Sequence, residues 1–177
     1  MTGDSSAART AVFAALARAL GLAPASPEAS RRILRAYADP PPPVPSPSAD
    51  VLYYDLFPDP SAAPRPEETT VSANRAEIFH FIPYILQLVF YGPRAEADAN
   101  AVRARLYLDG PGRPRRILRE VGIYPVPHPP EPDVLHEAED FRHRKRADLT
   151  VRLRIADVQT VSGIETVSSA PAIIKYY

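Results

Sequence analysis

The sequence predicts an α/β (α+β) protein in which a mixed or antiparallel sheet of about four to five strands is flanked by helices. Residues 84–91 and 147–155 alternate with the period of two that is typical of strands. Residues 7–20 and 95–108 instead place apolar side chains at helical spacing. Proline, which accounts for 22 of the 177 residues, is concentrated between these segments. We therefore expect an N-terminal helical hairpin and stiff proline-rich loops around one sheet.

The N-terminal segment predicts a helical hairpin over residues 1–39. Residues 7–20 carry one apolar helical face, and Gly21 follows in the position of a C-cap. The Ser-Pro-Glu sequence at 26–28 suits the N-cap, the first helical position and the positive end of the helix dipole. A second helix is therefore expected from this point, ending before Pro40. Its apolar side is formed by Ile33, Leu34 and Tyr37.

Proline-rich segments divide the rest of the chain. Residues 40–50 predict a stiff polyproline-type spacer, and a ligand for an SH3 or WW domain is the weaker alternative. Residues 58–74 and 127–132 predict rigid loops, of which the first is long enough to be an arm or binding loop. The predicted organisation is a hairpin over 1–39, the spacer over 40–50 and a single α/β domain over 51–177.

The predicted central strand is residues 84–91. Both of its alternating faces are largely apolar, so we expect it to be covered on both sides. Pro83, which cannot donate to a strand ladder, predicts a bulge or the start of this strand. In residues 147–155 one face is apolar and the other strongly polar, which predicts one buried face and one that meets solvent or another chain.

Shorter elements complete the predicted body. Strands are expected over 51–57, 122–126, 161–167 and 172–177. The helix over 95–108 has an inward stripe formed by Ala95, Ala99, Val102 and Leu106. A further short helix over 113–121 is expected to point Ile117, Leu118 and Val121 inward.

Composition excludes several function classes. The chain has no cysteine, so it has no disulfide framework, thiolate metal site or cysteine nucleophile. Its 21 basic residues match its 21 acidic ones, which leaves no overall field to attract nucleic acid or an anionic membrane. The same balance leaves little charge to keep copies apart, which suits a protein that assembles. The first residues lack a basic n-region, and no apolar run is long enough to span a bilayer.

Signals for catalysis are weak. Gly110-x-Gly112 is too short for a dinucleotide fingerprint, and neither a Walker lysine nor a nucleophile elbow is present. The segment from His136 to His143 has metal-capable side chains without a known ligand spacing, so a solvated charged loop is the favoured interpretation. No catalytic, cofactor-binding or metal-ligating residue is predicted, and the protein is not expected to be an enzyme.

The most charged segment is Arg142-His143-Arg144-Lys145-Arg146. One hypothesis is a small nucleic-acid-binding module that uses Arg142, Arg144, Lys145 and Arg146 on phosphates. The favoured interpretation is a surface loop balanced by the preceding acids Glu137, Glu139 and Asp140. A third is a rim contact with an acidic neighbouring subunit, where such charges set register more than affinity.

An ordered set of features between Ile82 and Ile164 resembles a known family. A strand ending in Phe90-Tyr91-Gly92 is followed by an alanine-rich helix and by a short helix that ends in Gly122-Ile123. A later strand opens with Arg146-Ala147-Asp148. This order is similar to that of the tailed-phage neck or tail terminator (tail-completion) proteins. The N-terminal hairpin and the spacer lie outside the resemblance.

The resemblance implies a structural virion protein at the neck, assembled in the host cytoplasm. Such a subunit forms a ring, expected to be a hexamer, that caps the tail tube protein and joins the tail to the head–neck connector. Genomic DNA is then only passing cargo in the lumen, and no membrane or cofactor is involved. A head-completion or stopper protein is the close alternative. The interface candidates are Arg142, Arg144, Lys145, Arg146, Asp148, Arg152, Arg154, Tyr176 and Tyr177.

Overall fold

The computed structural model describes residues 5–42, 46–61, 65–72, 75–139 and 142–162, and it confirms the predicted α+β class. The helices are α1 (Ser5–Ala19), α2 (Pro27–Arg32), α3 (Ala95–Arg105) and α4 (Pro114–Glu120). The strands are β1 (Ile33–Arg35), β2 (Val51–Pro58), β3 (Arg65–Ser72), β4 (Arg75–Tyr91), β5 (Ile123–Pro125), β6 (Asp133–Glu139) and β7 (Arg142–Ser162). In the described part of the chain, these seven strands form one sheet, more than the four to five expected.

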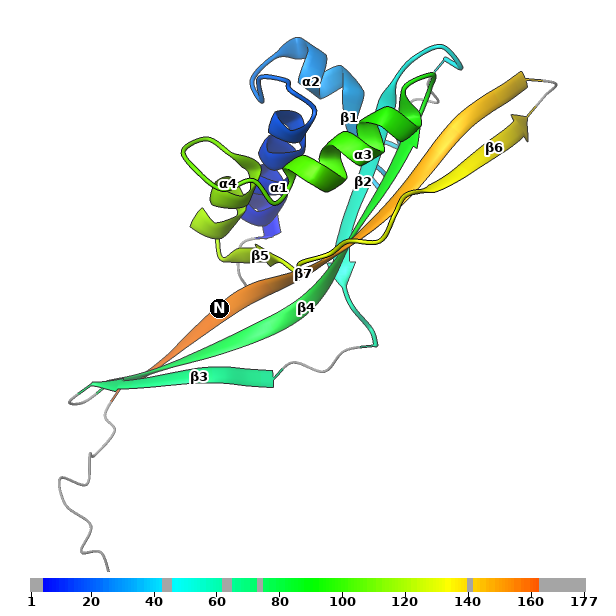
Figure 1. Ribbon diagram of the computed structural model, residues 1–177. Coiled ribbons are helices and arrows are strands. Elements are labelled where there is room, and N and C mark those ends of the chain that lie inside the picture. The colour runs from blue at the N-terminus through cyan, green and yellow to red at the C-terminus, as the bar shows by residue number, and fades with distance from the viewer. Residues whose placement is uncertain (1–4, 43–45, 62–64, 73–74, 140–141, 163–177) are drawn as a thin grey trace, which may run out of the picture.

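Two long antiparallel strands form the spine of the sheet. The β4–β7 ladder runs without interruption from the Arg75–Ser162 pair to the Tyr91–Arg146 pair. The main order is β1-β2-β4-β7-β5, with β3 paired to β4 and β6 paired to β7. Only the β1–β2 pair in this sheet is parallel. The four helices lie on one face of the sheet, and the strands continue past them at both ends (Figure 1).

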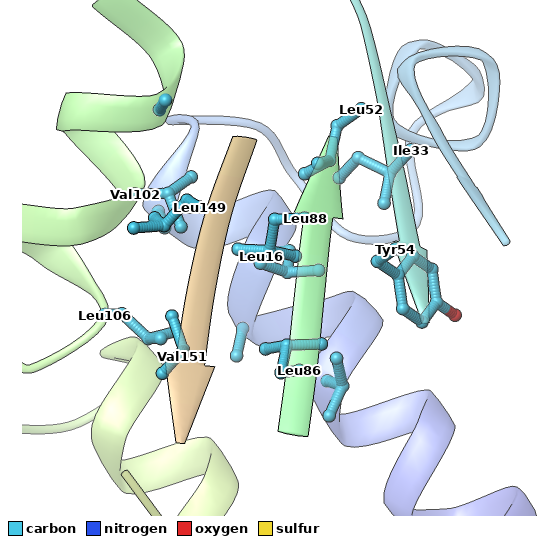
Figure 2. Close-up of a cluster of buried hydrophobic side chains, with 14 of the residues drawn as sticks. Leu16, Ile33, Leu52, Tyr54, Leu86, Leu88, Val102, Leu106, Leu149 and Val151 are labelled. Atoms are coloured by element: carbon cyan, nitrogen blue, oxygen red, sulfur yellow. The ribbon is translucent and has the colours of Figure 1, made fainter. Parts of the chain in front are cut away.

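The hydrophobic core lies between the helices and that face. Leu86, Leu88 and Phe90 of β4 are buried, and so are the apolar residues of β7 from Ala147 to Leu153. Leu16 of α1 and Val102 of α3 pack into the same cluster (Figure 2). The N-terminal segment therefore contributes to the core of the sheet. The proposed three-part division of the chain stays a prediction.

The first predicted helix and its cap are confirmed. Gly21 has φ +79°, the left-handed conformation that a C-cap glycine adopts at low cost. The Leu22 amide donates to the Ala17 carbonyl at 2.8 Å and the Gly21 amide to the Arg18 carbonyl at 3.1 Å. These two bonds form a Schellman motif, which satisfies the last carbonyl groups of the helix.

The second helix is shorter than predicted. Ser26 does cap it, since its hydroxyl accepts from the Ala29 amide at 3.1 Å. The helix ends at Arg32, however, and residues 33–35 pair in parallel with β2 as strand β1. Ile33 is buried in the core, whereas Tyr37 is 76% exposed. Burial of the β-branched Ile33 beside Leu52 outweighs the helical spacing of the sequence.

Two proline-based predictions are wrong. Residues 65–72, expected to lie in a loop, form strand β3, with a register shift between Pro66 and Glu68 that accommodates the proline. Strand β4 runs straight through Pro83. The Pro83 carbonyl accepts from the Asp59 amide at 2.9 Å, so the nitrogen of this residue also faces away from β7. On that side of β4, pairing with β2 ends at Tyr84 and pairing with β3 starts at Phe81. The missing N–H of Pro83 therefore removes no hydrogen bond from either ladder.

The predictions for the central strand and the short helix are corrected in part. Residues 84–91 were expected to be covered on both faces, but the described helices cover one face. The residues of the other face are half-buried or exposed. In α4, Leu118 is buried as expected, but Val121 is 40% exposed. The predicted stripe of α3, from Ala95 to Leu106, is buried throughout. Of the proposed strand over 161–167, residues 161 and 162 belong to β7 and the rest lie outside the described residues, as does the proposed strand over 172–177.

A buried ion pair ties α2 to the start of α3. The Arg32 guanidinium donates to an Asp98 carboxylate oxygen at 2.6 Å, and Arg94 lies 3.4 Å from the other oxygen. Burial raises the pKa of Asp98, while the charges of Arg32 and Arg94 act to lower it. Asp50 joins the same corner by accepting from the Arg94 amide at 2.8 Å. Gly92 allows this approach, since a Cβ there would lie 2.5 Å from the Ala49 carbonyl oxygen.

We predict that Val151→Asp unfolds the subunit. Val151 is fully buried, so an aspartate there places an unpaired charge in the core, which costs about 3 kcal/mol or more. Urea denaturation followed by circular dichroism measures the loss. Thr150→Asp adds the same charge at the neighbouring exposed position and should change the free energy of unfolding by less than about 0.5 kcal/mol. Equal stability of the two variants would contradict the assigned faces of β7.

We also predict that Asp98→Ala lowers the free energy of unfolding by about 2 kcal/mol, because it removes the charged hydrogen bond to the half-buried Arg32. Asp98→Asn keeps a hydrogen-bond acceptor of the same shape and should lose less. Urea denaturation of both variants measures the difference. An alanine variant as stable as the wild type would show that this ion pair does not hold α2 against α3.

Candidate assembly interface

The face of the sheet opposite the helices carries a broad band of side chains, which we call the open face. Because strand residues alternate, the positions between the buried residues of β2, β4 and β7 all point to this side. The register brings them together across the three strands. The band consists of Tyr53, Asp55, Phe57, Phe81, Pro83, Ile85, Gln87, Val89, Tyr91, Asp148, Thr150, Arg152 and Arg154.

The apolar and aromatic side chains of the open face lie on β2 and β4, on both sides of a polar row formed by Asp55, Gln87 and Thr150. Tyr53 and Tyr91 meet edge to face with ring centroids 5.9 Å apart, and Phe81 meets Tyr124 of β5 in the same way at 5.6 Å. Burial raises the pKa of both Tyr53 and Tyr91. Side chains such as Ile85 are half-buried within the described part of the chain. Apolar surface of this kind gains free energy when a partner covers it.

Charged groups cluster at the end of this face where β6 pairs with β7. The Arg146 guanidinium donates two hydrogen bonds of 2.7 Å to the carboxylate of Asp148. It also donates to Glu137 of β6. The hydrogen bond to Asp148 is the main cause that raises the pKa of Arg146. The guanidinium groups of Arg144 and Arg146 lie 5.4 and 5.7 Å from the ring centroid of Tyr91, which adds cation–π attraction.

The charged segments before and after residue 140 are strands, not the loop that the sequence predicted. Opposite charges face each other in the register where Glu137 lies across from Arg144. Such cross-strand pairs stabilise a sheet. A search of the described residues shows no group of three or more metal-capable side chains. No helix in that part of the chain has the length and apolar character needed to cross a membrane.

The predicted interface residues fall into three groups. Arg144, Arg146, Asp148, Arg152 and Arg154 lie on one side of β7, and Arg152 and Arg154 are exposed. Lys145 points to the helical side, where its amino group lies 2.8 Å from Glu96 of α3; the hydrogen bond from Lys145 lowers the pKa of Glu96. Arg142 is placed only by its register, and Tyr176 and Tyr177 lie outside the described residues.

These contacts weigh against the nucleic-acid module. Two of its four basic residues, Lys145 and Arg146, are paired with carboxylates, and they point to opposite faces of the sheet. Their charge is therefore largely neutralised before any phosphate approaches.

Sequence reasoning missed the apolar part of the open face. Ile85 and Val89 were expected to be covered, because both alternating faces of residues 84–91 are largely apolar. The available signal was the small number of helices, since the helical segments in the sequence can cover only one side of a sheet of this length.

A sheet with one face packed against helices and the other left open suits a structural subunit that associates with other proteins. Comparison with known families agrees with this class. The family of phage neck terminator proteins matches residues 10–176, and the chain belongs to that family. It is a structural protein of the phage neck. The match also includes most of the N-terminal hairpin and the spacer, which the resemblance seen in the sequence left out. No curated protein matches the chain.

We predict that Arg146→Ala loosens the β6–β7 hairpin without unfolding the core, because it removes the bonds to Asp148 and Glu137 and the contact with Tyr91. Hydrogen exchange of the β6 amides should become at least about tenfold faster, a loss of about 1.4 kcal/mol of local stability. Arg146→Lys keeps the charge but not the bidentate hydrogen bonds to Asp148, so it should restore the protection of the β6 amides from exchange only in part. Exchange as slow as in the wild type would contradict this role.

Proposed function

We propose that the chain forms a hexameric ring that caps the tail tube and joins the tail to the head–neck connector. The observation that carries this proposal is the open face, whose half-buried apolar side chains are rimmed by Arg152 and Arg154. Membership of the neck terminator family supports the place of the ring in the virion. The number of copies, the tube and the connector are part of the proposal.

The shape of the sheet supports a ring. Closed rings need a heterologous interface, in which one surface of a subunit contacts a different surface of the next. Beyond the helices, residues 75–81 of β4 extend with β3 and with residues 156–162 of β7. The hairpin of β6 and β7 extends at the opposite end (Figure 1). These two projections can reach neighbours on either side, while the open face offers a surface to receive them.

The energetics favour association through this face. Removal of apolar surface from water contributes about 25 cal/mol per Å², and the aromatic pairs are already ordered, so little side-chain entropy is lost on contact. The rim arginines can fix register through charge, which sets specificity more than affinity. The net charge of zero adds no long-range repulsion between copies.

The experiment that tests this proposal uses Arg152→Glu. Arg152 is exposed on the open face, so its charge reversal should leave the circular dichroism spectrum unchanged and shift the protein from ring mass toward monomer mass in light scattering. Negative-stain images of the protein, alone and mixed with tube protein, show whether rings form.

Arg31→Glu serves as the control, since it makes the same charge change on exposed α2 and should assemble normally. If Arg152→Glu forms rings as well as this control, the open face is not the interface. A wild-type chain that stays monomeric and binds no tube protein contradicts the function as a whole.

A further inference from the structure

A second surface lies on the helical side of the molecule, away from the open face. A hollow of about 590 Å³ is formed between the C-terminal turn of α1 and the segment that joins α3 to α4. Three arginines, Arg18, Arg105 and Arg113, line it, and none of the described residues that line it is acidic. We call this surface the arginine hollow.

The arginines of the hollow lack the carboxylate partner that six other arginines of the described chain have. Arg32, Arg94, Arg103, Arg116, Arg119 and Arg146 each lie within 4.0 Å of a carboxylate. Among the described residues, Arg18, Arg105 and Arg113 form no such pair. In a chain with a net charge of zero, the hollow is therefore a local concentration of positive charge with which no acid of the described residues forms an ion pair.

Backbone geometry holds this charge in place. The Arg105 guanidinium donates to the Ala19 carbonyl at 3.2 Å, so the last carbonyl groups of α1 fix its position. The C-terminal end of a helix favours a cation, which stabilises this arrangement. Gly21 lines the hollow opposite this side chain, and a Cβ there would lie 3.8 Å from the Arg105 nitrogen. The positive charge of Arg105 is thus held in a fixed position within the hollow.

The walls of the hollow are partly apolar. Leu108 is 45% exposed, and Leu22, Pro111 and Pro114 line the same space. A site with guanidinium groups above apolar walls suits a carboxylate that is carried next to an apolar side chain. A DNA duplex fits it less well, because its phosphates lie on a convex surface and bring no apolar group into a hollow.

We infer that the arginine hollow binds an acidic segment of another neck or tail protein, through an Asp or Glu side chain flanked by an apolar one. The inference rests on the proposed function, since a ring at the neck contacts other rings as well as its own copies. It assigns these contacts to two surfaces: the open face for neighbouring copies and the arginine hollow for an adjoining ring.

The test uses the double variant R18E/R113E in the full chain. Neither side chain forms a hydrogen bond or ion pair with a described residue, and both are exposed, so the fold and the ring mass should be unchanged. Affinity for the tail tube protein or for the connector protein, measured separately by surface plasmon resonance, should fall at least about tenfold for one of them. R31E, which reverses one exposed arginine outside the hollow, is the control and should bind both like the wild type.

Each outcome decides between the possibilities. Ring mass retained with weakened binding to one partner supports the inference. Unchanged binding to both partners, when the wild type binds at least one, overturns it while the proposed function stands. A loss confined to binding of a DNA duplex also overturns it, in favour of a nucleic-acid contact. A wild type that forms no ring and binds neither partner overturns the proposed function, and the inference falls with it.

Discussion

The structure depends on the uninterrupted pairing of β4 with β7. This ladder of 17 residue pairs, from Arg75 with Ser162 to Tyr91 with Arg146, is longer than the helices can cover. Helix packing on one side buries Leu86, Leu88, Val151 and their neighbours, which supplies the hydrophobic stabilisation of the subunit. The ends of the same two strands extend past the helices, so a single element provides both the core and the projections.

One-sided packing explains where the chain can interact. The helices pack on one face to form the core and leave the arginine hollow on their outer surface, while no described helix covers the aromatic and aliphatic side chains of the open face. A stable monomer usually exposes only small apolar patches, so the apolar side chains of β2 and β4 on this face favour contact with other chains. That expectation agrees with a family of phage neck terminator proteins.

Charge is distributed in a way that separates stability from recognition. The carboxylates of Asp98, Glu137 and Asp148 are paired with arginines that hold elements of the subunit together. Arg152 on the open face and the arginines of the hollow are exposed instead. A protein whose charges sum to zero can therefore offer specific charged surfaces without repelling its own copies.

The sequence by itself determined the elements whose signals are local. The spacing of apolar residues along a few neighbouring positions predicts the α1 helix, the inward stripe of α3 and the two faces of β7. The position of Gly21 after that pattern predicts the cap of α1. Only the tertiary structure decided what depends on distant partners. Pro83 is tolerated inside β4 because its nitrogen faces the gap between the pairings with β2 and β3. Ile33, predicted to be helical, pairs with Leu52 as part of strand β1. The charged residues around position 140 pair as strands, and the apolar side of Tyr53 and Ile85 stays open. Each outcome is set by long-range pairing and by how much surface the helices can cover, and neither quantity is encoded in the local pattern.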